Sequence, residues 1–301
     1  MSVASREAWF DGGFAVMPDG ARLPVKAWKA DVPKAVIVAT HGYNNTHGEF
    51  EVFGPAPWFA VRSVTFYAFD QRGFGNAPMR GRWAGATRMA RDVAALARLA
   101  QAMHPGVPVY VLGQSMGGAV TILATALRDM PDVAGVILAA PGLRGWEQMS
   151  FARQLGLRLT AWLKPDEPIP AGAQAWKGTD NEALEVAFDN DPARLHQSAY
   201  GTISGLAGMM SKARRLAPRI RVPVLFVYGA HDHAITKASV APIVRKMREA
   251  NVPMVFAYYE DGWHSILNGL NRETVWEDML SWVGDKAKEL PSGADKSSFG
   301  R

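Results

Sequence analysis

The sequence predicts an α/β fold with a mostly parallel, doubly wound sheet and an inserted helical cap. Short runs of almost continuously apolar residues, rich in Val and Ile, alternate with longer segments in which apolar residues recur every three or four positions. Continuous apolar runs are typical of strands covered on both faces, as in parallel sheets. The alternation indicates strand–helix–strand units with right-handed crossovers. Residues 143–217 interrupt it without a convincing strand.

The expected elements follow in chain order. Residues 8–30 form an antiparallel start with its turn at Pro-Asp-Gly, 18–20. Apolar runs predict strands at 35–39, 64–69, 107–112, 133–139, 222–228 and 253–259. Helical spacing predicts helices at 87–103, 116–128, 237–251 and 271–288, and two more stretches near 152–163 and 206–216.

The interruption divides the chain into expected domains. Residues 1–142 and 218–290 form the core, and 143–217 form a helical cap, or lid, over the carboxyl edge of the sheet, where ligands of open α/β sheets bind. The polar, Gly- and Ser-containing residues 291–301 are expected to be a flexible tail.

Composition excludes several classes of function. The chain has 301 residues, 48% of them hydrophobic and none of them cysteine, which rules out disulfides, thiolate metal sites and a cysteine nucleophile. The net charge of +5 arises from 33 basic and 28 acidic residues that are dispersed, so we expect no nucleic-acid partner. His231 and His233 flank Asp232, but such clusters are more often solvent-facing loops than metal sites, and we expect no metal and no cofactor.

Location and assembly are less determined. The first ten residues lack the apolar core of a signal peptide, and no stretch approaches the roughly 20 apolar residues that a membrane span needs. We therefore expect a cytoplasmic protein and leave open a peripheral contact with a membrane or lipid surface. The sequence does not indicate an oligomeric state.

Gly113-Gln114-Ser115-Met116-Gly117 is the sharpest local motif. It lies between an expected strand and an expected helix, the context that a nucleophile elbow requires. Glycines on both sides of Ser115 would let the strand and the helix approach closely. An ordinary Gly-rich turn is the competing interpretation, whereas a phosphate-binding loop is excluded because no Lys follows.

A nucleophilic Ser115 needs a base and an acid that orients the base. His264 follows the last expected strand and therefore lies at the same sheet edge as Ser115. Asp232 follows the preceding strand, which makes it the preferred acid. Asp261 and Glu260 are weaker candidates because they stand too close to His264 in the sequence to reach its far nitrogen easily.

Two backbone N–H groups are expected to form an oxyanion hole. Met116 follows the nucleophile and supplies one donor. Tyr43, in the turn after the strand at 35–39, supplies the second. His41 then has a structural role in this turn, because it precedes Ser115 and a better placed base exists.

Together these residues resemble the α/β-hydrolase superfamily, and more narrowly its serine hydrolases of the monoacylglycerol lipase and lysophospholipase type. The resemblance covers about residues 10–288 and rests on 41–42, 70–75, 113–118, 229–232 and 264–268. It implies the α/β-hydrolase fold and a triad of Ser115, Asp232 and His264. It also implies oxyanion donors at Tyr43 and Met116, with a structural role for the Asp-x-Arg-Gly-x-Gly stretch. The chain departs from the family at 43–47 and 76–78, which leaves the substrate open.

Apolar residues of the cap and of the segment after the oxyanion turn are candidates for binding an acyl chain, although packing alone would also explain them. The candidates are Phe53, Trp58, Leu155, Leu159, Trp162, Met209 and Met210. We therefore expect a hydrolase of small-molecule carboxylic esters, of the monoacylglycerol or lysophospholipid type, that works through an acyl-enzyme. Carbon–carbon bond hydrolases, thioesterases and perhydrolases share this triad and remain alternatives. A non-enzymatic binding protein is disfavoured because every member of the triad is present.

Overall fold

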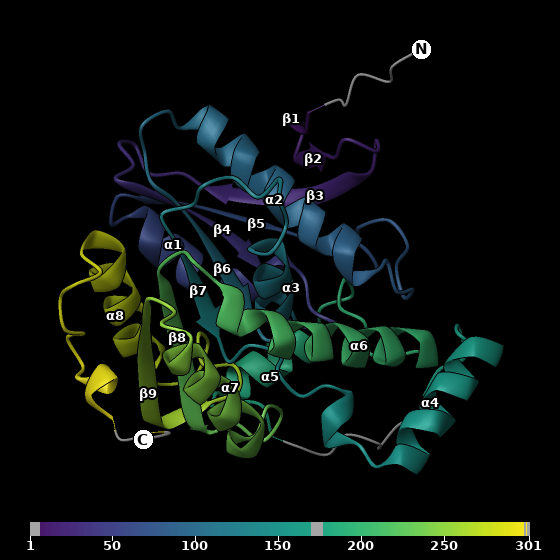
Figure 1. Ribbon diagram of the computed structural model, residues 1–301. Coiled ribbons are helices and arrows are strands. Elements are labelled where there is room, and N and C mark those ends of the chain that lie inside the picture. The colour runs from purple at the N-terminus through teal and green to yellow at the C-terminus, as the bar shows by residue number, and fades with distance from the viewer. Residues whose placement is uncertain (1–6, 170–176, 298, 300–301) are drawn as a thin grey trace.

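The computed structural model describes residues 7–169, 177–297 and 299, and its centre is a nine-stranded sheet. The strand order is β1-β2-β3-β5-β4-β6-β7-β8-β9 (Figure 1). The antiparallel strands at one edge are β1 (Trp9–Asp11), β2 (Phe14–Val16) and β3 (Arg22–Trp28). The parallel strands are β4 (Ala35–Thr40), β5 (Val64–Phe69), β6 (Val109–Gln114), β7 (Gly135–Ala139), β8 (Val224–His231) and β9 (Met254–Trp263). This topology confirms the predicted mostly parallel sheet and the antiparallel start.

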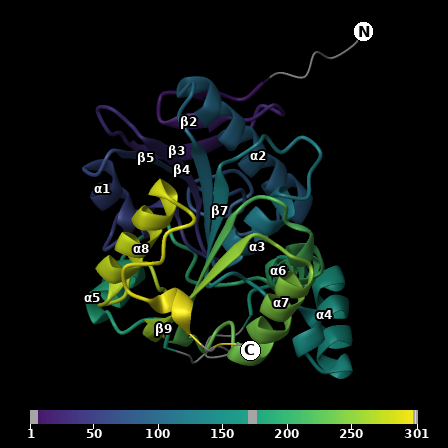
Figure 2. The same cartoon turned by 60° about the vertical axis from the view of Figure 1, so that its left-hand side comes forward.

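Helices cover both faces of the sheet. One face packs against α2 (Ala86–Met103), α3 (Met116–Ala124) and α7 (Lys237–Glu249), the other against α1 (Pro55–Ala60) and α8 (Arg272–Gly284), as Figure 2 shows. Alternate residues of one strand serve the two sides: Val36 and Val38 belong to the first core, whereas Ile37 belongs to the second. Burial of both faces explains the continuous apolar runs of the parallel strands.

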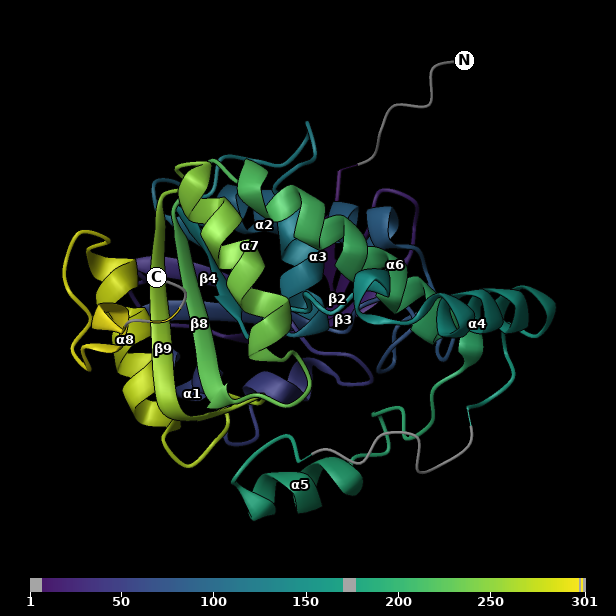
Figure 3. The same cartoon turned by 60° about the horizontal axis from the view of Figure 1, so that its bottom comes forward.

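The segment expected to be a cap contains α4 (Phe151–Leu163), α5 (Glu182–Asp189) and α6 (Tyr200–Leu216). The helix α6 packs against α3 of the core, and α4 lies on the outer side of α6 (Figures 1 and 3). The helix α5, which the sequence pattern did not predict, lies apart from both, and the side chain of its N-cap residue Asn181 donates to the backbone oxygen of Asn268 at 2.9 Å.

The expectation of a flexible tail at 291–301 does not describe residues 291–297 and 299. Phe299 is buried, and its ring lies 4.8 Å from that of Phe256 and 5.0 Å from that of Tyr258. The backbone N–H of Ser292 donates to the buried carboxylate of Asp278 at 3.0 Å. The segment is therefore attached to β9 through Phe299 and to α8 through Ser292. Of the helices within the described residues, none has both the length and the apolar character needed to cross a membrane.

Candidate active site

Ser115 lies at the tight turn between β6 and α3, where its φ is 51° and its ψ is −114°. The glycines around it are required by space. A Cβ at Gly113 would lie 2.4 Å from the backbone oxygen of Gly117, and a Cβ at Gly117 would lie 2.0 Å from that of Thr40. Strand and helix can therefore meet only without these side chains, and the turn is the strand–elbow–helix arrangement of a nucleophile elbow.

The structure brings together Ser115, His264 and Asp232 from three different strand ends. Ser115 Oγ lies 2.8 Å from His264 Nε2, and His264 Nδ1 lies 2.9 Å from Asp232 Oδ2. The second carboxylate oxygen, Oδ1, accepts the backbone N–H groups of Ala234 at 3.0 Å and Ile235 at 2.8 Å. An ionised Asp232 only accepts, so Nδ1–H of His264 donates to it and Nε2 is left to accept the Ser115 proton.

The surroundings of His264 favour its protonated form. Burial alone opposes the charge, but the carboxylates of Asp232 and Glu49 outweigh it and raise the pKa of His264 above the ordinary 6.5. All three members of the group are buried: Ser115 is 9% exposed, Asp232 4% and His264 7%. A base that is shielded from water and supported by carboxylates can take a proton from a hydroxyl at 2.8 Å.

The segment from His41 to Tyr43 is here called the oxyanion loop, after the role that the sequence predicts for it, and within the described residues the N–H of Tyr43 has no acceptor. His41 Nε2 accepts the N–H of Gln71 at 3.0 Å, so Nδ1–H donates to the oxygen of Gly42 at 2.7 Å. Burial lowers the pKa of His41 to about 4, which keeps the ring neutral, as this tautomer requires. In a trans peptide the N–H points opposite to the C=O, so the Tyr43 N–H faces away from His41.

The N–H of Met116 is the other predicted donor. It belongs to the first turn of α3, where backbone N–H groups have no acceptor within the helix. In the part of the chain that the structure describes, neither this group nor the N–H of Tyr43 donates to another residue. Both are therefore available to a ligand.

Glu49 is a buried residue of this site that sequence reasoning missed. It belongs to the short 3-10 helix His47–Phe50 and is 4% exposed. Its carboxylate accepts the N–H of Gly42 at 2.6 Å and the side-chain amide of Asn45 at 2.8 Å. Burial raises the pKa of Glu49 to about 7, against the effect of both hydrogen bonds and of the nearby charge of Arg194. A single acidic residue in a polar loop gives no pattern that could have revealed this position.

Three of the predicted acyl-binding residues lie on α4 and are exposed to solvent. Leu155 is 57% exposed, Leu159 52% and Trp162 77%. The side chains of α4 that are partly buried, Gln154 and Leu157 among them, belong to a different face of the helix. The structure therefore does not bring the apolar stripe of α4 to Ser115. It leaves the stripe uncovered on the outer side of the molecule.

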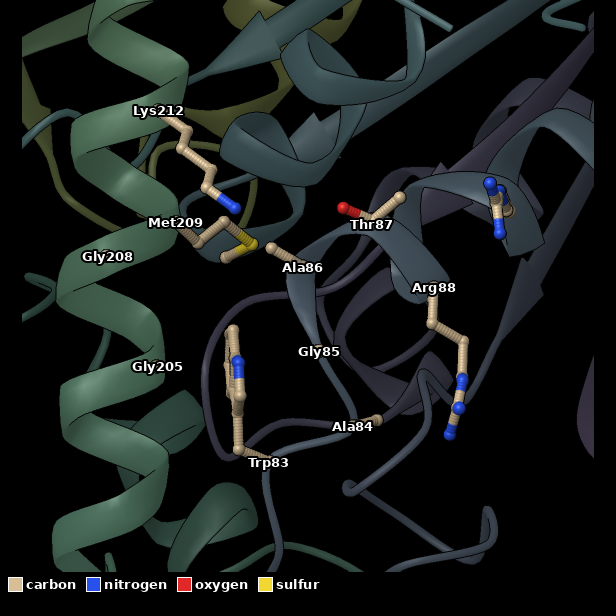
Figure 4. A pocket seen from close by; sticks show the side chains of 11 residues that line it. Trp83, Ala84, Gly85, Ala86, Thr87, Arg88, Gly205, Gly208, Met209 and Lys212 are labelled. Carbon is tan, nitrogen blue, oxygen red and sulfur yellow. The ribbon is translucent and has the colours of Figure 1, made fainter. Parts of the chain in front are cut away.

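The two predicted methionines of α6 are both buried but have different neighbours. A Cβ at Gly142 would lie 2.9 Å from Met210 Cε and 3.1 Å from the backbone oxygen of Ser115, so both atoms lie beside Gly142. Met209 instead lines a hollow of about 560 Å³ between α2 and α6, together with Trp83, Thr87 and Lys212 (Figure 4). Neither Ser115 nor His264 lines this hollow.

The remaining candidates lie beside the core. Phe53 lies shortly after the 3-10 helix His47–Phe50 and is 38% exposed. The guanidinium of Arg272 lies 5.4 Å from the centre of its ring. The ring of Trp58 is partly buried, lies 5.8 Å from that of Trp276 and packs against the second core. Packing thus accounts for Trp58.

His231 and His233 pack against one aromatic ring. Their rings lie 5.1 Å and 5.9 Å from that of Trp263. Within residues 7–169, 177–297 and 299, no group of three or more His, Asp or Glu side chains is gathered as a metal ion would need.

The Asp-x-Arg-Gly-x-Gly stretch braces neighbouring loops. Asp70 accepts the N–H groups of His47 and Asn76, both at 2.8 Å. Arg72 makes two hydrogen bonds of 2.7 and 2.8 Å to the buried Asp92, and two more of the same lengths to Asp19. These contacts lie within the framework that carries the oxyanion loop.

Comparison with known proteins adds a family. The model of the family described as serine aminopeptidase, S33, matches residues 31–271. A monoacylglycerol lipase of Mycolicibacterium smegmatis is 25% identical over 267 residues, which are 88% of this chain and 93% of that protein. A monoglyceride lipase of Rattus norvegicus is 24% identical and covers 90% of this chain and 89% of its own. The solved structure of a soluble variant of the monoglyceride lipase of Saccharomyces cerevisiae with a substrate analog superposes with a TM-score of 0.72 at 18% identity. The match covers 95% of this chain and 97% of that chain.

Proposed function

The chain belongs to the serine aminopeptidase S33 family of α/β-hydrolases and is a carboxylic ester hydrolase, and we propose that it cleaves monoacylglycerol or lysophospholipid-type esters through Ser115, Asp232 and His264. The observation that carries the mechanism is the continuous chain of hydrogen bonds from Ser115 Oγ through the imidazole to Asp232, at 2.8 and 2.9 Å. Nucleophile, base and orienting acid stand in the geometry that acyl transfer requires.

The reaction runs in two halves. His264 Nε2 takes the proton of Ser115 as Oγ attacks the ester carbon, and the carbonyl electrons move to an oxyanion that accepts the N–H groups of Tyr43 and Met116. Collapse of this intermediate expels the alcohol, which takes the proton from His264 and leaves an acyl-Ser115. Water then attacks the acyl group, gives a proton to His264 and releases the acid, and Ser115 recovers its proton.

Two observations support the substrate class: the names of the relatives, and the type of residue at position 210. The relatives described above from Mycolicibacterium smegmatis and Rattus norvegicus are named as lipases of monoacylglycerols or monoglycerides. In this chain the flexible apolar side chain of Met210 and the backbone oxygen of Ser115 both lie beside Gly142, and methionine is a residue type that adapts to acyl chains of different shape.

A labelling experiment tests the mechanism and a substrate panel tests the class. A fluorophosphonate probe is expected to label the purified protein and to fail on Ser115→Ala. Turnover is expected to be highest within a series of monoacylglycerols of increasing chain length, compared with acyl-CoA thioesters, short aryl esters and aminoacyl anilides. If the probe labelled Ser115→Ala, Ser115 would not be the nucleophile. If the protein preferred a thioester or an anilide, the proposed substrate class would be wrong.

The exposed stripe of α4 supports a contact with a lipid surface. Phe151, Leu155, Leu159 and Trp162 recur every three or four residues and are all more than half exposed, and Arg158 lies on the same helix. A helix with one apolar face and basic residues suits the interface of an anionic bilayer.

Vesicle binding tests this contact. The full chain is expected to sediment with vesicles of anionic phospholipid, and Leu155→Ser with Trp162→Ser is expected to abolish this. The matched control is Val186→Ser, at a position of α5 that is 61% exposed. Equal binding of the double variant and the control would show that α4 is not the contact.

A further inference from the structure

We propose that Glu49 is a positioning residue for the hydrolysis: its carboxylate fixes the oxyanion loop through Gly42, and its negative charge supports the protonated state of His264. The inference rests on the proposed function and adds to the site a second carboxyl group, one that contacts the oxyanion loop. Three groups of observations carry it: the hydrogen bonds that Glu49 accepts, its position relative to Ser115, and the charges that face it.

The hydrogen bonds fix the residue that precedes the oxyanion donor. The carboxylate of Glu49 accepts the N–H of Gly42 at 2.6 Å, while the oxygen of Gly42 accepts Nδ1–H of His41 at 2.7 Å. Both peptide groups that flank the Gly42 α-carbon are thus held by buried side chains. Because glycine is the most mobile residue of a backbone, these two contacts decide where the following N–H, that of Tyr43, points.

The position of the carboxyl places it beside the nucleophile. The point at which Gly42 would carry a Cβ lies 3.3 Å from Glu49 Oε1 and 3.6 Å from Ser115 Cβ. Glu49 and Ser115 therefore both lie beside Gly42. Glu49 is 4% exposed. A charge that is buried in a medium of low dielectric constant acts on its neighbours far more strongly than a charge in water.

The charges that face Glu49 come from two other elements. His264 lies in the loop after β9, and Arg194 lies in the segment between α5 and α6. The electrostatic interaction with Glu49 raises the pKa of His264, in addition to the larger effect of Asp232 and against the effect of burial. Burial raises the pKa of Glu49 itself to about 7, so this carboxyl changes its charge near neutral pH.

Glu49→Gln separates the two roles, because the side-chain amide oxygen can still accept the Gly42 N–H but carries no charge. In pH profiles of kcat/KM for an ester substrate, the acid limb of this variant is expected to move to lower pH by about half a unit. Glu49→Ala also removes the acceptor and is expected to lower kcat by at least about tenfold, with little change in KM. The matched control is Glu51→Gln, two residues away and half-exposed, which is expected to leave the profile unchanged.

The outcomes separate this inference from the proposed function. Fluorophosphonate labelling of the unmodified protein, together with an unmoved acid limb in Glu49→Gln, would overturn the charge role alone. A wild-type kcat in Glu49→Ala would overturn the anchoring role. Absence of labelling in the unmodified protein would overturn the proposed function and with it the role of Glu49. Circular dichroism of both variants distinguishes a kinetic effect from loss of fold.

Discussion

Asp232→Asn is the substitution for which the structure makes the most detailed prediction. Asp232 Oδ1 accepts two backbone N–H groups, from Ala234 and Ile235, and Oδ2 accepts Nδ1–H of His264. An asparagine has one oxygen and one amide nitrogen for these three donors. If its nitrogen faced the turn, two buried N–H groups would lose their acceptor, at a cost of about 1–3 kcal/mol each. The oxygen therefore stays on the turn, and the nitrogen faces the imidazole.

The consequence is a change of tautomer. The amide N–H of the new residue donates to Nδ1, so the proton of His264 moves to Nε2, which faces Ser115 Oγ at 2.8 Å. In that form the imidazole cannot accept the hydroxyl proton. A triad with the wrong tautomer loses about 10⁴-fold in kcat, or about 5.4 kcal/mol of barrier, in the serine protease in which this substitution is the standard example. The fold should be kept, since every hydrogen bond of the turn survives.

Steady-state hydrolysis of a chromogenic ester, with a thermal melt of the same sample, measures both quantities. We expect kcat to fall by about four orders of magnitude, KM to stay within a few-fold and the melting temperature to be unchanged. The matched control is Asp261→Asn, an exposed carboxylate at the end of β9. If Asp232→Asn kept more than about 1% of the activity, or if Asp261→Asn lost as much, Asp232 would not be the orienting acid.

Three further predictions concern the stability of the fold and are tested by thermal or urea unfolding. Arg72→Met leaves the buried carboxylate of Asp92 unpaired and is expected to lower the free energy of unfolding by about 3–5 kcal/mol. Adding Asp92→Leu is expected to restore most of this stability. A free energy of unfolding for Arg72→Met within about 1 kcal/mol of the parent would contradict the prediction. Gly117→Ala places a methyl group 2.0 Å from a backbone oxygen of β4 and is expected to prevent stable folding, whereas Gly156→Ala, which meets open space on α4, is expected to gain up to about 1 kcal/mol. Because the folded-state pKa of Glu49 is raised from 4.5 to about 7, the native protein binds more protons than the unfolded chain in that window and loses stability as the pH rises through it. The stability of Glu49→Gln relative to the parent should therefore increase between pH 5 and 8 by up to about 3 kcal/mol, and a constant difference would refute the assignment.

The sheet and the grouping of Ser115, Asp232 and His264 could be predicted because each rests on a local pattern with one spatial meaning. Continuous apolar runs mark strands covered on both sides, and residues that directly follow parallel strands must meet at one sheet edge. His264 follows β9 and Asp232 follows β8, so the order of elements alone brought them to the edge where Ser115 follows β6.

The exposure of α4, the helix α5 and the place of Glu49 could not be predicted in this way. The spacing of apolar residues in α4 predicted a helix with one apolar face, but such spacing does not indicate whether other parts of the protein cover that face. In the structure Leu155 and Trp162 are exposed. The short helix α5 was not predicted because the residues at its start are polar. Its N-cap side chain, that of Asn181, accepts the N–H of Leu184. Glu49 became a site residue only because the 3-10 helix turns its carboxylate inward onto Gly42, which is a tertiary contact without a sequence period.

The backbone conformation of Ser115 bears on how this chain could evolve. At φ 51° and ψ −114° a side chain is strained, typically by about 1–3 kcal/mol, whereas glycine would occupy the same conformation without penalty. Selection for stability alone would therefore favour glycine at position 115 and an inert protein with the same fold. The strained serine at this position is therefore explained by its proposed role as the nucleophile and not by the stability of the fold.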